Sequence, residues 1–273
     1  MEVDYNPEAT QSDVYLNFVY LDPSGLNFNA GMRYNHHNAY DGHFIYSLNP
    51  SYSFAFDSDQ QLKLFSSYSK AFIAPSLYKL YDPSYGNNDL MPENNISFEF
   101  GAEIRSRQNV ISAVYFNRKE DPTLIFGPPT DGYQFGRYAN SDKKIVYKGV
   151  ELAYDFVLFK KVKSRLNYIF TETTEGDLRS IPKHAINGVM DFPLSDLTHL
   201  NLVGQYFGER VANDSKTLLE GYSLFTLQLN HQLKKHNANI FLSVYNLFDA
   251  EYVIIPQYAT RGRNILAGIS IQL

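Results

Sequence analysis

Histidines and carboxylates are the residues of this sequence that could carry acid–base or metal chemistry. Seven histidines are present, and only His36 and His37 are adjacent. On a strand these two side chains point to opposite faces, which is poor geometry for binding one metal ion. We interpret the pair as polar residues at the start of a loop, with a weak haem or metal contact as the alternative.

Three glutamates, Glu99, Glu103 and Glu151, fall on the polar face of the predicted strands and could pass for paired catalytic acids. Acid–base catalysis needs a carboxyl whose pKa is raised by burial or by a neighbouring charge. Nothing beside these residues in the sequence would supply that shift, so we interpret them as water-exposed residues of the polar face of the sheet. We find no Gly-x-Ser-x-Gly elbow, no phosphate-binding loop and no HExxH pair.

Composition excludes several further classes. The chain has no cysteine, which rules out a thiolate nucleophile, a disulfide framework and a Cys-based zinc site. Its net charge of −5 gives no reason to expect a nucleic-acid partner. We therefore expect a protein that is not an enzyme and that has no cofactor. The sequence also shows no signal peptide after Met1, so an exported chain would be a mature fragment or part of a longer gene product.

The dominant pattern is a period of two, which is the signal of β-strands. Ile96, Phe98 and Phe100, for example, alternate with Ser97 and Glu99. The pattern predicts about thirteen strands, near residues 12–22, 25–37, 44–56, 60–73, 93–106, 108–126, 132–158, 162–173, 184–194, 197–209, 221–233, 237–249 and 262–273. Several of these runs are longer than the five or six residues of a usual globular strand.

The predicted connections alternate between short and long through the whole series. Tight turns at residues 22–25, 57–59, 107, 160–161, 194–196 and 235–237 separate longer loops at 38–42, 74–92, 127–132, 172–183, 210–220 and 252–261. An antiparallel meander with all its long loops at one end is typical of outer-membrane barrels. A soluble sheet would show the same alternation in any single strand, with the buried and exposed faces exchanged.

Aromatic residues fit the membrane interpretation. The chain has 22 Tyr and 20 Phe, and many fall near predicted strand ends, where interfacial girdles place such rings. The girdle candidates are Tyr20, Tyr34, Tyr68, Tyr115, Tyr154, Tyr168, Tyr206 and Phe248. The alternative is that β-propensity alone accounts for them.

Two segments resemble the signature of TonB-dependent outer-membrane receptors. The first runs from Tyr68 to Glu93 and contains an "AP…L…Y" stretch followed by "GN..L.PE". The second runs from Asn246 to Arg263 and resembles the family's "NLFD..Y…GR" ending. Between them, the "KGVE" of residues 148–151 and the Ile-Pro-Lys-His of residues 181–184 are similar to two further family motifs.

The resemblance implies an all-β fold: an antiparallel transmembrane β-barrel meander of about thirteen strands, the C-terminal part of a 22-stranded barrel. Residues 1–273 would form a partial barrel domain, without the plug domain and the N-terminal strands. It further implies the bacterial outer membrane as location, with membrane lipid, a large nutrient and the TonB energy-transducing complex, reached through the missing plug, as partners. Cobalamin is favoured as the nutrient, and a siderophore or haem is the alternative.

Large substrates of such receptors are bound by aromatic and amide side chains from the outer loops. The candidates are Tyr81, Tyr85, Asn87, Asn88, Tyr133, Tyr138 and Tyr258, with ordinary loop surface as the alternative for each. We expect Tyr258 above all to contact the substrate, since the resemblance to cobalamin transporters places a substrate-facing tyrosine at that position. A passive porin-like channel and a soluble β-rich binding protein are the competing functions.

Overall fold

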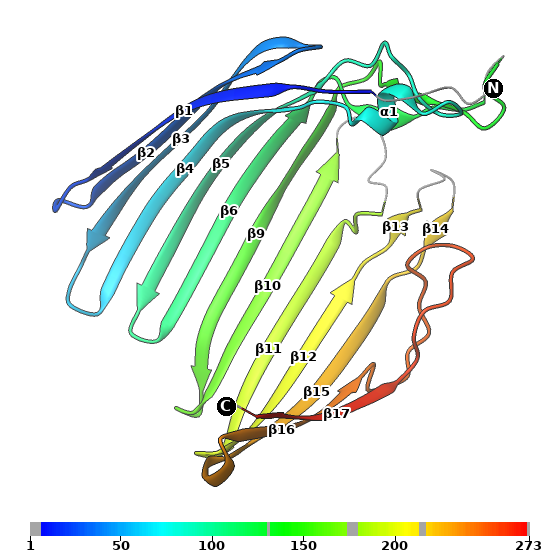
Figure 1. The fold of residues 1–273 in the computed structure, drawn as a ribbon. Coiled ribbons are helices and arrows are strands. Elements are labelled where there is room, and N and C mark those ends of the chain that lie inside the picture. The colour runs from blue at the N-terminus through cyan, green and yellow to red at the C-terminus, as the bar shows by residue number, and fades with distance from the viewer. Residues whose placement is uncertain (1–6, 130–131, 174–179, 213–216, 272–273) are drawn as a thin grey trace.

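Thirteen strands form one curved antiparallel sheet in the computed structural model (Figure 1), which describes residues 7–129, 132–173, 180–212 and 217–271. Each strand of this sheet pairs with the next one along the chain, and β1 and β17 are its edges. Its strands are β1 (Gln11–Leu21), β2 (Leu26–His37), β3 (Asp41–Ala55), β4 (Gln60–Ile73), β5 (Glu93–Ser106), β6 (Asn109–Glu120), β9 (Ile145–Leu158), β10 (Val162–Thr173), β11 (His184–Ser195), β12 (Thr198–Phe207), β15 (Tyr222–Leu233), β16 (Ala238–Tyr245) and β17 (Asn264–Ile271).

The connections confirm the predicted segregation of turns and loops. Tight turns join β1 to β2, β3 to β4 and each later pair at one end of the sheet, and the long loops gather at the other end (Figure 1). The long loops carry the helix α1 (Leu77–Tyr81) and two small hairpins, β7 (Leu124–Phe126) with β8 (Tyr138–Asn140) and β13 (Arg210–Val211) with β14 (Leu218–Leu219). No helix of the described ranges is long and apolar enough to cross a membrane.

Four predicted boundaries were wrong. The loop expected at residues 38–42 is a tight connection of residues 38–40, because β3 already begins at Asp41. The strands expected at 108–126 and 132–158 stop at Glu120 and start at Ile145, since Pro122 cannot donate to the ladder and residues 121–144 form a long loop. The strand expected at 237–249 ends at Tyr245, where Asn246 adopts a left-handed φ of 49°. Parts of three predicted loops, at 130–131, 174–179 and 213–216, and predicted strand residues 272–273 lie outside the described residues.

Strand register divides the sheet into two faces of opposite character. In antiparallel pairs, directly opposed residues point to the same side. Leu152 is opposed by Ala113 and Tyr168, and this register continues as an apolar face across the sheet. Glu151 and Asp155 lie on the opposite, polar face, where Arg165 opposes Asp155. Val150, Leu152 and Tyr154 thus share the apolar face, and Glu151 lies on the polar face as predicted.

The predicted girdle aromatics lie on the apolar face. Seven of them occupy apolar-face positions of the strands, namely Tyr20, Tyr34, Tyr68, Tyr115, Tyr154, Tyr168 and Tyr206. Phe248 follows β16, and its ring packs edge-on against the apolar-face ring of Phe225, with the centroids 5.3 Å apart. Large apolar side chains on this face stay exposed, as Ile104 at 53% and Leu166 at 46% illustrate. The apolar face is thus built to meet an apolar surrounding.

Candidate ligand-binding loops

The long loops form two groups that contain the candidate residues. One group joins residues 74–92 to residues 121–144, and the other joins residues 208–221 to residues 246–263. Six of the seven predicted ligand contacts fall in the first group and Tyr258 falls in the second. Figure 1 shows α1 and the loop before β17 at different places along the long-loop end of the sheet.

Hydrogen bonds clamp the two loops of the first group together. The backbone N–H of Tyr138 donates to the carbonyl of Tyr85 over 3.0 Å, and the side-chain amide of Asn87 donates to the carbonyl of Tyr138 over 2.9 Å. The Asn140 side chain both accepts from the Met91 N–H at 2.7 Å and donates to the Met91 carbonyl at 2.9 Å. Four bonds across segments about fifty residues apart hold these loops in one body.

The "GN..L.PE" segment supplies this clamp. A Cβ at position 86 would lie 2.6 Å from the backbone of Asp82, so the tight turn after α1 requires Gly86. Leu90 is only 2% exposed, and the Glu93 carboxylate accepts the N–H of Leu124 over 2.7 Å. Gly86, Leu90 and Glu93 of this motif thus have structural roles.

The candidate side chains of the first group differ in how far they are already held by contacts within the loops. The oxygen of the Asn87 side chain accepts the N–H of Asp89 at 3.0 Å, so this residue is committed to the loop itself. Asn88 is exposed and lines a hollow of about 430 Å³ with Tyr81 and Tyr133. The Arg137 guanidinium, which also lines the hollow, lies 4.6 Å from the centre of the Tyr133 ring. This hollow combines aromatic, amide and cationic groups.

An aromatic cluster joins α1 to the β7–β8 hairpin within the same group of loops. Tyr138 meets Tyr78 and Phe126 edge-on, with centroid distances of 6.1 and 5.2 Å, and the Lys79 ammonium lies 5.8 Å from the centre of the Tyr138 ring. Desolvation, together with the Asp82 carboxylate, raises the pKa of Tyr78 above its ordinary value. The sequence pattern missed Tyr78, Lys79 and Arg137, although the density of Tyr and basic residues in these loops was the available signal.

Tyr258 projects from the second group of loops. It is 72% exposed and lines a hollow of about 670 Å³ with Tyr222, Tyr252 and Arg261 among its walls. The loop that carries it is fixed by Asn246, whose side chain donates to the Ala250 carbonyl and accepts the Ala250 N–H, both at 2.9 Å. The Asp249 carboxylate accepts the N–H of Arg263 at 2.6 Å. The "NLFD..Y…GR" motif therefore positions the loop and leaves Tyr258 available.

Arg210 links the two loops of this second group. It is only 6% exposed, and its guanidinium lies 5.1 Å from the centre of the Tyr222 ring and donates to the carbonyl of Val253. Tyr222 in turn packs on Tyr252, with ring centroids 4.8 Å apart. Sequence reasoning missed all three residues, because they come together only through contacts between separate loops.

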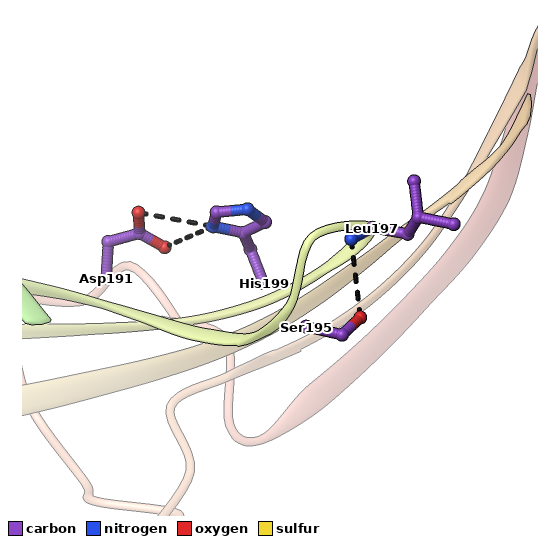
Figure 2. Close-up of polar contacts among 4 residues, drawn as sticks. All are labelled: Asp191, Ser195, Leu197 and His199. Carbon is purple, nitrogen blue, oxygen red and sulfur yellow. Dashed lines mark hydrogen bonds and ion pairs between the residues drawn. The ribbon is translucent and has the colours of Figure 1, made fainter. Parts of the chain in front are cut away.

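Serine, histidine and aspartate residues also lie near the turn between β11 and β12. His199 Nδ1 lies 3.1 Å from an Asp191 carboxylate oxygen, whereas the Ser195 hydroxyl accepts the N–H of Leu197 at 3.3 Å (Figure 2). Ser195 lies on the other side of the ribbon from the Asp191–His199 pair (Figure 2), so the three cannot relay a proton as a nucleophile, base and orienting acid. Within the described residues, no cluster of three or more His, Asp or Glu side chains could hold a metal ion.

The family profile described as "TonB dependent receptor-like, beta-barrel" matches residues 3–247, which is most of the chain. The chain belongs to the TonB-dependent receptor family. Members of this family are outer-membrane proteins of Gram-negative bacteria, so the apolar face of this receptor chain meets lipid and its polar face lines the barrel.

Individual relatives agree with this assignment. The receptor chain is 25% identical over 255 residues to the vitamin B12 transporter BtuB of Vibrio cholerae, a match that covers 89% of the chain and 39% of the relative. Its fold is similar to the siderophore receptor PirA of Pseudomonas aeruginosa, with a TM-score of 0.76, 20% identity and coverage of 96% of this chain and 46% of that one. The ferric enterobactin receptor PfeA of the same organism gives a TM-score of 0.75 at 21% identity, with coverage of 96% and 45%. The receptor chain thus spans less than half of the length of each of these relatives.

Proposed function

We propose that this chain is the C-terminal part of the barrel of a receptor that takes up a large, scarce nutrient across the outer membrane, with cobalamin favoured. In this proposal residues 1–273 form one partial barrel domain, and a plug domain and further strands complete it. The energy for transport would come from the TonB complex acting through the plug. The observation that carries the proposal is the pair of rigid, aromatic-lined loop groups above a sheet of this family.

Cobalamin is favoured on sequence rather than on fold. A relative that matches over most of the chain is named as a vitamin B12 transporter, and the spacing of Tyr258 before Gly262 and Arg263 resembles that sub-family. A tyrosine offers a flat apolar ring with a polar tip and few rotatable bonds, which suits a large amphipathic ligand such as a corrin. The exposure of Tyr258 leaves its ring free for such a contact.

A ferric siderophore is the second candidate. PirA and PfeA are a siderophore receptor and a ferric enterobactin receptor, and their likeness to this chain is one of fold. Arg137 and Lys79 beside the hollow of Tyr133 and Asn88 would suit an anionic iron complex. The two candidates therefore favour different loop groups, Tyr258 for cobalamin and the Tyr133 hollow for a siderophore.

Equilibrium binding to the intact receptor distinguishes these candidates. Cyanocobalamin and a ferric catecholate are each titrated against the receptor in detergent by calorimetry, with a neutral disaccharide as the control for passive channel behaviour. Saturable binding of cyanocobalamin alone is expected. Saturable binding of the ferric complex alone would replace cobalamin by a siderophore, and no saturable binding of either would overturn the nutrient-receptor proposal.

A further inference from the structure

Charged side chains on the apolar face are confined to one end of the sheet. Among the strand residues that the structure describes, the apolar-face positions carry only four charges, at Lys70, Lys119, Lys148 and Glu172. Each of these residues lies within a few positions of a long loop. The arginines on the described strands of the main sheet all occupy the polar face, namely Arg33, Arg105, Arg118 and Arg165. A lipid-facing charge is costly near the bilayer centre, which accounts for its absence elsewhere on this face.

The register places these lysines at nearly one height across neighbouring strands. Lys70 on β4 and Lys119 on β6 both oppose Ile96 of the intervening β5. Lys148 on β9 opposes Asn117, two residues from Lys119, so the two lysines are diagonal neighbours on adjacent strands. Diagonal neighbours of this kind are about 7–8 Å apart. A row of ammonium groups therefore crosses the sheet at the level where the strands end.

Lys183 extends the row to β11. It directly precedes that strand, its carbonyl accepts the N–H of Thr171, and its ammonium lies 5.6 Å from the centre of the apolar-face ring of Phe170. We use the name lysine row for Lys70, Lys119, Lys148 and Lys183.

Aromatic rings lie directly beneath the lysine row on the same face. Tyr68 and Phe98 oppose each other one step below Lys70, and Tyr115 lies one step below Asn117. Phe98 is 43% exposed and Tyr115 is 41% exposed. Aromatic belts mark the depth of lipid headgroups, so the lysine row stands at or just beyond the headgroup level.

Internal carboxylates neutralise only part of the row. Lys148 pairs with Glu172 at 2.9 Å, and Asp121 lies 3.7 Å from Lys119 and 3.9 Å from the loop residue Lys144. Among the residues that the structure describes, the ion pairs of these five lysines thus involve two carboxylates, which leaves an excess of positive charge among them at the headgroup level. Glu172 disfavours an anion directly beside Lys148, so the Lys70–Lys119 side and Lys183 are the favoured positions.

We propose that the lysine row binds the phosphate groups of anionic lipid in the outer leaflet of the membrane. Lysine contributes a compact charge with three donors, which suits a phosphate monoester or diester without demanding one orientation. The aromatic rings beneath would contact the acyl chains of the same lipid, while the long lysine side chains reach outward to the headgroup. The row would thereby attach a defined lipid to strands β4 to β11, beside the first group of loops.

The test uses the intact receptor in detergent and bis-phosphorylated lipid A as the probe. Native mass spectrometry measures the lipid bound to the wild type and to two triple variants. The test variant combines Lys70→Gln, Lys119→Gln and Lys183→Gln. The matched control, at the short-turn end, combines Lys161→Gln, Lys234→Gln and Lys235→Gln. The test variant should lose at least about tenfold in affinity, because each juxtamembrane lysine contributes independently to attraction of anionic lipid. The control variant should bind as the wild type does.

Two further measurements test whether the lipid phosphates are what the lysine row binds. Lipid A from which both phosphates have been removed should bind the wild type and the test variant equally. Inorganic phosphate at millimolar concentration should not displace the lipid, and complete displacement would assign the row to free phosphate instead. Equal affinity of wild type and test variant for the bis-phosphorylated probe would overturn the proposal, and a gel shift on heating checks that each variant has folded.

Discussion

The side-chain amide of Asn87 donates a hydrogen bond to the backbone carbonyl of Tyr138, 51 residues away along the chain, over 2.9 Å. Asn87→Ala removes this bond and the one its oxygen accepts from Asp89. We expect the local opening of residues 74–92 to become easier by about 1–2 kcal/mol, the usual contribution of one or two hydrogen bonds. Hydrogen exchange of the Asp89 amide measures this directly. Asn88→Ala, at an exposed neighbour, is the matched control, and equal exchange in both variants would contradict the clamp.

The assignment of the two faces predicts opposite outcomes for adjacent residues. Leu152→Arg places a charge on the lipid-facing side of β9 and should lower the free energy of unfolding by about 2–4 kcal/mol if Leu152 lies near the bilayer midplane. Glu151→Gln changes a water-exposed residue of the polar face and should leave the free energy of unfolding nearly unchanged. Urea unfolding of the intact receptor in lipid compares them. Equal losses would mean that the faces are reversed.

Loss of the Tyr258 ring should weaken ligand binding without a change in stability. Tyr258 is largely exposed, so truncation to Ala removes little packing from the chain itself. An aromatic anchor typically contributes about 1–2 kcal/mol, which corresponds to roughly 5- to 30-fold in Kd for cyanocobalamin. Tyr258→Phe separates the ring from the hydroxyl and should retain most of the affinity. Unchanged Kd in the Ala variant would remove Tyr258 from the site.

The turn between β1 and β2 should weaken in strong acid because of Asp22. The hydroxyls of Ser24 and Tyr20 and the backbone N–H of Ser24 bond this carboxylate and lower its pKa from 3.8 to about 2. Because the folded pKa is depressed, the stabilisation is complete above about pH 4 and is lost as the pH falls toward 2. The protection of the Gly25 amide, which donates to the Asp22 carbonyl, should fall over that window. Asp22→Asn should abolish the pH dependence, and a transition that persists in this variant would exclude Asp22 as its cause.

The sequence was sufficient for the sheet because its physical signal is local. The side chains of a strand alternate between faces, so Leu152 and Glu151 could be assigned to opposite faces from their neighbours alone. The turn near Gly25 could also be predicted from the sequence, since residue 25 has a positive φ of 100°, a conformation that favours glycine. The prediction failed on both sides of the expected loop at 127–132, where residues 121–126 and 133–144 were assigned to the two flanking strands. The β7–β8 hairpin there depends on bonds to the distant loop of Asn87 and Met91, which no local pattern reports.

The candidate site was less predictable for the same reason. Tyr81, Asn88 and Tyr133 could be chosen as candidates by residue type, but their shared hollow arises from contacts between loops far apart in sequence. Arg210 gave no signal at all, because its importance comes from burial against Tyr222. Residue type therefore indicated the kind of contact, and the three-dimensional arrangement decided which residues make it.

The odd number of strands in the main sheet fixes how its two edges can be joined. In an antiparallel meander of thirteen strands, β1 and β17 run in the same direction, from the long-loop end to the short-turn end. Direct pairing of these edges, within one chain or between two copies that share an orientation in the membrane, would create a parallel seam with slanted hydrogen bonds. A closed barrel that is antiparallel throughout therefore requires an odd number of further strands between the β1 and β17 edges.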